Sequence, residues 1–187
     1  MIRNQALLSK LTEGNRRFLG AVSPIGDVSP AARLHAAENG QKPYAIVLAC
    51  SDSRVMPESI FSAGLGELFV IRVAGNVLDD HQLGSIEYAA AHLDCRMIIV
   101  LGHTGCGAVH AALTGEVDGF TQYITDEILL AVGDEKDEER ACWLNVQHAV
   151  ETIRREFAAH PEIPSAELDV VGAVYDIATG AVRWLED

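Results

Sequence analysis

The chain has 187 residues, of which 49% are hydrophobic, so we expect one globular domain over residues 1–187 with a buried core. Its formal net charge of −13 argues against nucleic acid and anionic membranes as partners, because both would be repelled by an acidic surface. The N-terminal stretch lacks the apolar segment of a signal peptide, and no apolar run reaches the ~20 residues that span a bilayer. We therefore expect a cytoplasmic protein whose four cysteines stay reduced and serve a metal site or buried packing.

The N-terminal part of the chain is expected to form an arm followed by a buried strand. Apolar residues at helical spacing predict an amphipathic helix over residues 3–19, and Gly, Pro and Ser over residues 20–30 predict a loop. We expect this arm, residues 1–30, to lie away from the main core and to pack on a partner subunit. The continuous apolar run 44–50 predicts a strand that is buried on both faces.

Strands and helices alternate along the rest of the chain. Apolar runs predict strands over 68–75 and 97–103, and helical patterns occur over 83–93, 106–115 and 143–160. The polar segment 116–140 is expected to form a solvated turn and a helix start. Residues 168–186 should form a strand, a turn at Thr179 and Gly180, and a second extended piece. This alternation predicts an α/β fold with a central, mainly parallel β-sheet flanked by helices.

Side chains that can bind a metal stand where two predicted strands end. Cys50 ends the first strand, His103 ends the third, and Cys106 follows three residues later. The carboxyl ends of parallel strands meet at one edge of a sheet, so these three side chains can converge. Two thiolates and an imidazole suit tetrahedral zinc and leave a fourth position for water. Spacing alone leaves structural burial of these residues open as the alternative.

Two charged residues flank the proposed ligand Cys50. Asp52 and Arg54 follow it at intervals of two, so in an extended segment all three can face the same side. A carboxylate beside a metal-bound water can accept its proton or occupy the open position, and an arginine can hold that carboxylate bidentately. A loop-stabilising ion pair is the structural alternative. No Gly-rich phosphate-binding motif follows the first strand, which disfavours a nucleotide enzyme.

The motifs "CSDSR", from Cys50, and "GHTGCGA", from Gly102, resemble those of the β-class carbonic anhydrases. The resemblance covers nearly the whole chain, since "LTEGNRRF", "LFVIRVAGN", "SIEYAAAHL" and "VYDIATGAV" follow in the family's order. It implies reversible hydration of carbon dioxide to bicarbonate and a proton by zinc-hydroxide attack. Cys50, His103 and Cys106 match the zinc ligands, and Asp52 and Arg54 match the catalytic dyad. In some members the aspartate also binds zinc, in a closed state.

The resemblance further implies a substrate pocket at a subunit interface. Gln41, Phe69 and Tyr88 match positions that line this pocket, and members form homodimers or dimers of dimers in which the N-terminal helix reaches over the neighbour. Two departures are evident. Val73 stands where the family usually has asparagine, which alters hydrogen bonding near the pocket wall. Val47 stands where bicarbonate-regulated members have tryptophan, which argues against that regulation.

Several alternatives remain open at this point. Carbonyl sulfide and carbon disulfide are also linear and apolar, so a hydrolase acting on them through the same zinc site is the first alternative. A non-catalytic zinc- or anion-binding module is disfavoured by the presence of both Asp52 and Arg54, and a redox thiol protein by the lack of Cys-x-x-Cys. His92, one helical turn after Tyr88, is a candidate proton shuttle, with an ordinary surface or core histidine as the alternative.

Overall fold

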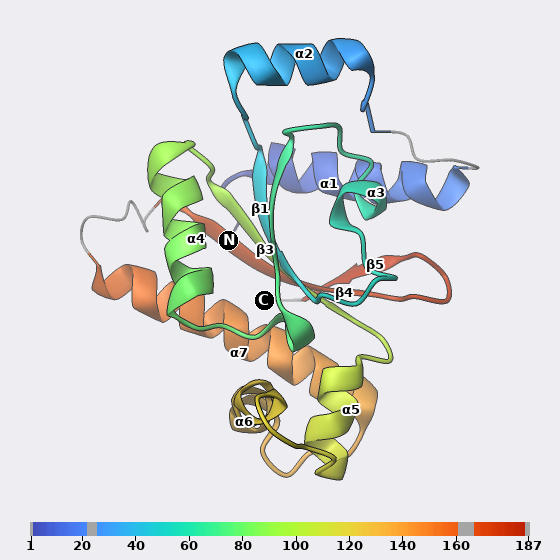
Figure 1. Ribbon diagram of the computed structural model, residues 1–187, viewed down its shortest axis with the longest axis vertical. Coiled ribbons are helices and arrows are strands. Elements are labelled where there is room, and N and C mark those ends of the chain that lie inside the picture. The colour runs from blue at the N-terminus through green and yellow to red at the C-terminus, as the bar shows by residue number, and fades with distance from the viewer. Residues whose placement is uncertain (1, 22–25, 161–166, 186–187) are drawn as a thin grey trace.

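A five-stranded β-sheet forms the centre of the computed structural model, which describes residues 2–21, 26–160 and 167–185 (Figure 1). The strands are β1 (Ala45–Ala49), β2 (Leu68–Arg72), β3 (Met97–His103), β4 (Asp169–Tyr175) and β5 (Val182–Trp184). They lie in the order β2-β1-β3-β4-β5. The first four run parallel and β5 is antiparallel to β4. The predicted α/β fold with a mainly parallel sheet is confirmed.

Helices cover both faces of this sheet (Figure 1). They are α1 (Gln5–Gly20), α2 (Pro30–Asn39), α3 (Pro57–Ile60), α4 (Asp80–His92), α5 (Gly107–Thr114), α6 (Thr121–Val132) and α7 (Glu138–Ala159), with a 3-10 turn η1 (Ala74–Asn76). Side chains of α4 and α7 pack with Ile46 and Leu48 on one face, and those of α1 and α3 pack with Ala45 and Val47 on the other. The alternate residues of β1 thus face two cores, which explains why its sequence is continuously apolar.

The first helix does not lie away from the core, so that expectation is wrong for α1. Leu11 is fully buried in the α1–α3 core. The side-chain amide of Asn15 donates to the carbonyls of Ile60 and Gly180, at 3.3 and 2.9 Å. These contacts fasten α1 to its own chain, and its packing on a partner subunit stays a prediction. Residues 22–25 of the predicted loop lie outside the described residues.

Three helices were not predicted, namely α2, α3 and α6. The segment 116–140 contains the whole of α6, whose Ile128 is fully buried, as well as the expected turn and helix start. The helix expected at 143–160 begins earlier, at Glu138, where the Asp137 side chain caps it by accepting from the backbone N–H of Arg140. None of the helices within the described ranges is long and apolar enough to cross a membrane.

Candidate metal centre

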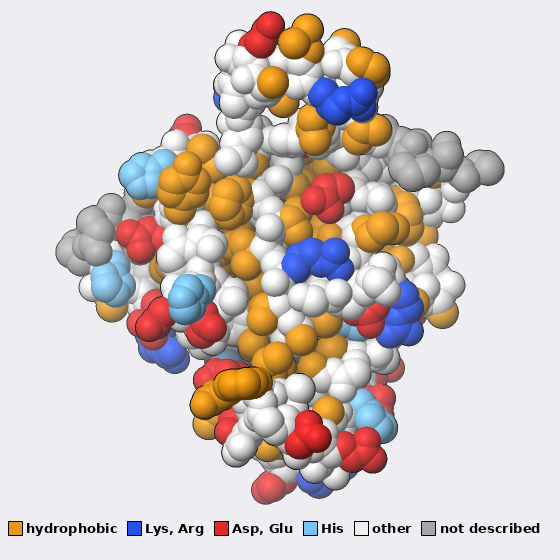
Figure 2. All heavy atoms as spheres, viewed as in Figure 1, with side chains coloured by type: hydrophobic (Ala, Val, Ile, Leu, Met, Phe, Trp, Pro, Cys, Tyr) orange, Lys and Arg blue, Asp and Glu red, His pale blue; other side chains and the backbone are white. Residues whose placement is uncertain are grey.

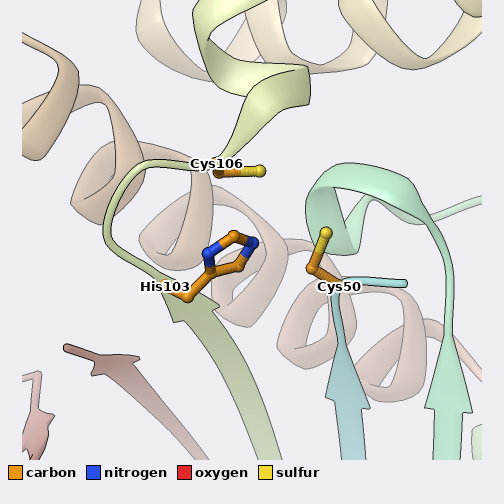
Figure 3. A group of neighbouring side chains, drawn as sticks. All are labelled: Cys50, His103 and Cys106. Carbon is orange, nitrogen blue, oxygen red and sulfur yellow. The ribbon is translucent and has the colours of Figure 1, made fainter. Parts of the chain in front are cut away.

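Three side chains from neighbouring elements converge at the carboxyl end of the sheet. Cys50 directly follows β1, His103 ends β3, and Cys106 precedes α5. Because Ala49 lies opposite Leu101 in the sheet, the ends of β1 and β3 lie side by side. The two sulfurs and one imidazole nitrogen all lie within 4.8 Å of one another. Figure 3 shows the three side chains pointing into one shared space, and all three are buried.

The hydrogen bonding of the His103 ring suits a metal ligand. Its Nδ1 lies 3.1 Å from the Thr104 carbonyl oxygen, which fixes the ring. Its Nε2 is buried and has no hydrogen-bond partner among the described residues. When Nδ1–H donates to a carbonyl, Nε2 keeps a free lone pair, and this is the usual arrangement of a zinc-bound histidine. The spacing of the three ligand atoms also fits zinc, with bonds of about 2.3 Å to sulfur and about 2.0 Å to nitrogen.

The two thiols of the cluster are electrostatically coupled. A hydrogen bond from the Cys106 thiol is the largest cause that lowers the pKa of Cys50, to about 4. The same hydrogen bond raises the pKa of Cys106, and burial raises it further. The backbone N–H groups of Asp52 and Gly75 also donate to Cys50 Sγ, at 3.4 and 3.3 Å. The cluster therefore favours a single thiolate, and a cation between the sulfurs would favour ionisation of the second.

Asp52 and Arg54 form a bidentate ion pair beside the cluster. The guanidinium Nε and Nη2 donate to Oδ1 and Oδ2 at 3.0 and 2.7 Å, and the backbone N–H of Arg54 donates to Oδ1 at 2.9 Å. These hydrogen bonds from Arg54 hold the pKa of Asp52 well below its usual range. Within the described residues, the ligand cluster contains Cys50, His103 and Cys106 but not the Asp52 carboxylate. Asp52 is thus paired with arginine and does not occupy a ligand position.

Arg72, to which the sequence analysis assigned no role, fixes the same loop from the end of β2. Its Nε donates to the carbonyl of Cys50 at 3.2 Å, and its Nη2 donates to the carbonyl of Asp52 at 2.7 Å. One guanidinium therefore holds the backbone on both sides of Ser51. The signal in the sequence was a charged residue within the apolar strand predicted over 68–75.

The predicted pocket residues lie apart from the metal ligands of their own chain. Phe69 pairs with Ile46 in the sheet, four residues before Cys50, which is about 13 Å along the strand. The rings of Phe69 and Tyr88 lie 6.2 Å apart, and the Tyr88 ring is 5.2 Å from that of His92. Tyr88 is 49% exposed. Gln41 is also exposed.

Cys95 and Cys142 are buried outside the ligand cluster. Burial raises the pKa of both thiols to about 11, so they stay protonated at neutral pH. This agrees with the expectation that cysteines outside a metal site serve buried packing.

Comparison with known proteins identifies the family. Residues 45–182 match the family model described as carbonic anhydrase. The chain is 39% identical to "Carbonic anhydrase 2" of Mycobacterium tuberculosis over 183 residues, which cover 91% of this chain and 87% of that protein. Its fold is similar to that of the β-carbonic anhydrase of Coccomyxa in complex with acetazolamide, with a TM-score of 0.69, 30% identity and coverage of 95% of this chain and 86% of the other. It is also similar to a structure of the tetrameric β-carbonic anhydrases of Sordaria macrospora, with a TM-score of 0.66, 29% identity and coverage of 84% and 92%. With the Cys-His-Cys cluster at the end of its parallel sheet, the chain belongs to the β-class of the carbonic anhydrase family.

Proposed function

We propose that the protein catalyses zinc-dependent, reversible hydration of carbon dioxide to bicarbonate and a proton, with Cys50, His103 and Cys106 as the metal ligands. The observation that carries this proposal is the buried cluster of two sulfurs and one unpartnered imidazole nitrogen beside an Asp–Arg pair. Membership of the carbonic anhydrase family supports it. The relatives reported above are all named carbonic anhydrases, so they lend no support to hydrolysis of carbonyl sulfide or carbon disulfide.

The proposed metal ion and the residues around the cluster have different roles in the reaction. Zinc bound at this site would act as a Lewis acid and lower the pKa of a bound water far below that of bulk water. Two thiolate ligands leave less positive charge on that water than three imidazoles would, so we expect activity to rise from neutral to alkaline pH. Asp52, kept ionised by Arg54, accepts a hydrogen bond from the attacking water and orients it toward the carbon. Arg54 itself is held by the Gly105 carbonyl, at 3.3 Å.

The substrate pocket is proposed to be completed by a second copy of the chain. Phe69 and Tyr88 would supply an apolar wall for carbon dioxide, and the Gln41 amide would donate to a substrate oxygen where charge develops. These residues lie on the side of the exposed edge strand β2, away from their own metal ligands. Figure 2 shows hydrophobic side chains gathered at the surface between α4 and α3, where a partner could cover them.

We propose a homodimer or a dimer of dimers, and one similar structure is described as tetrameric. We also propose a cytoplasmic location, since the four cysteines form no disulfide and two of them are needed as metal ligands.

The test is carbon dioxide hydration by stopped flow from about pH 6.5 to about pH 9, on protein whose zinc content has been measured. We expect about one zinc per chain and turnover that rises with pH. Zinc-loaded protein without turnover at any pH would refute the proposed activity.

Asp52→Ala tests the role of the carboxylate. The variant should keep its zinc, because the three ligands are untouched, and lose most of its turnover, because nothing orients the attacking water. Full activity in zinc-loaded Asp52→Ala protein would refute the role given to Asp52. Glu67→Ala is a matched control, since it removes another carboxylate that forms an ion pair, with Lys10, away from the cluster.

A further inference from the structure

The backbone of Gly75 connects the proposed ligand Cys50 to helix α7 through its two flanking peptide groups. Its N–H donates to Cys50 Sγ at 3.3 Å, and its carbonyl accepts from the Asn145 side-chain amide at 2.8 Å. Asn145 is 4% exposed and stands 70 residues from Gly75 in the sequence. We propose that Asn145 is a positioning residue of the metal centre, which fixes the N–H group that donates to the Cys50 thiolate. This inference rests on the metal centre proposed above.

The turn that carries this N–H has one hydrogen bond of its own, from the Asn76 N–H to the Val73 carbonyl at 3.0 Å, and further support from outside. Gly75 and Asn76 both have left-handed backbone conformations, with φ of +68° and +45°. A left-handed residue other than glycine is strained and persists only when its surroundings hold it. The side-chain Nδ2 of Asn76 does not hold the turn, because it is buried and has no hydrogen-bond partner within the described ranges. A hydrogen bond to the neighbouring peptide from Asn145 supplies that support.

The surrounding helices restrict how Gly75 can be placed. A Cβ atom at this position would lie 2.8 Å from Ile128 Cδ1 of α6 and 3.1 Å from Ala108 Cβ of α5. The space beside the Gly75 Cα is thus closed by α5 and α6, which keeps the turn near the cluster, but packing of this kind does not set the rotation of a peptide plane. The hydrogen bond from Asn145 fixes the plane of the peptide between Gly75 and Asn76, and it thereby anchors Gly75 in the position from which its own N–H, in the preceding peptide, donates to Cys50 Sγ.

The placement of the Gly75 N–H has a chemical consequence at the sulfur. N–H groups that donate to a ligating thiolate withdraw charge from it and fix its direction, and such outer partners strongly affect metal affinity. Cys50 Sγ accepts from Asp52, which lies on its own loop, and from Gly75, which lies beyond β2. The second donor is the one that the distant Asn145 controls.

Asn15 provides a matched control for Asn145. It is also buried, at 6% exposed, and its side-chain amide also donates to a glycine carbonyl, that of Gly180, at 2.9 Å. It belongs to α1 and has no part in the metal cluster. A variant at either position removes a buried side-chain amide. Asn15 also donates to the Ile60 carbonyl and accepts from the Val182 N–H, but only the variant at Asn145 removes the donor to the Gly75 carbonyl.

The experiment compares Asn145→Leu and Asn15→Leu with the wild type. The zinc dissociation constant is measured by chelator competition, the sulfur-to-metal charge-transfer band on the cobalt(II)-substituted protein, and the melting temperature on the zinc form. We expect both variants to melt lower than the wild type. Only Asn145→Leu should weaken zinc binding, by about 10- to 100-fold, and shift the cobalt band.

Three results would overturn the inference. A wild-type zinc dissociation constant and cobalt band in Asn145→Leu would leave Asn145 a purely structural role. Equal weakening of zinc binding in Asn15→Leu would assign the effect to general loss of stability. If Asn145→Leu does not fold, Asn145→Ser is measured in the same way, and unchanged zinc binding there would overturn the inference. A wild-type protein that binds no zinc would instead refute the metal centre itself.

Discussion

The substitution Leu11→Ala tests whether α1 packs on the core of its own chain. Leu11 is fully buried between α1 and the sheet. Truncating a buried leucine to alanine removes its transfer free energy and leaves a cavity, which together cost about 2–5 kcal/mol. The higher helix propensity of alanine offsets only about 0.2 kcal/mol of this loss of stability. We therefore expect Leu11→Ala to lower the free energy of unfolding by about 3 kcal/mol.

Thermal unfolding, followed by circular dichroism at a fixed protein concentration, tests this value. In a chain of this size 1 kcal/mol corresponds to about 2–4 °C, so the melting temperature should fall by about 6–12 °C. The control is Leu19→Ala in the same helix, where the side chain is 50% exposed and the loss should stay below about 1 kcal/mol. Equal losses in the two variants would refute the packing of α1 on this core.

Two further predictions concern the cluster and a surface ion pair. Cys50→Ser should lose zinc, whereas Cys95→Ala, which also removes a buried thiol, should keep about one zinc per chain, as metal analysis would show. Glu138→Gln should lower the pKa of His110 in an NMR titration, because the Glu138 carboxylate lies 2.6 Å from the ring and its hydrogen bond raises that pKa. Because the pKa of His110 is raised in the folded state, the ion pair stabilises the fold fully below about pH 6.5, and this stabilisation is lost as pH rises through the raised pKa. The variant should therefore melt further below the wild type at about pH 6 than at about pH 9. An unchanged His110 pKa would contradict the second prediction, and Glu139→Gln, whose carboxylate binds Arg183 instead, is its control.

The strands and the ligand cluster could be predicted because the same physical rule produced both. β1 and β3 are buried on both faces, so their sequences are continuous apolar runs that differ sharply from their surroundings. A residue that directly follows or ends such a run must lie at the end of its strand, and in parallel strands these ends lie on the same side of the sheet. Cys50 and His103 do so, and parallel pairing of β1 with β3 brings them together.

Elements with a less distinctive pattern escaped prediction for identifiable reasons. No residue of α2 is buried, so its sequence carries no apolar stripe, and only Ser29 and Pro30 at its start indicate a helix. In α6 the fully buried Ile128 does belong to a helical stripe, but the charges that follow it dominate the segment. The bond between Asn145 and Gly75 uses a backbone carbonyl, which leaves no mark in the sequence of either segment.

The order of the strands explains how Cys50 is supported from two sides. β1 lies between β2 and β3, so the residue after β1 can be reached from both sides. From the side of β2, Arg72 binds its carbonyl and Gly75 donates to its sulfur. From the side of β3, His103 and Cys106 complete the ligand set. The placement of this thiolate therefore depends on the packing of three adjacent strands and of the helices that cover them. A buried substitution that shifts β1 relative to either neighbour should therefore weaken metal binding even where the fold as a whole is kept.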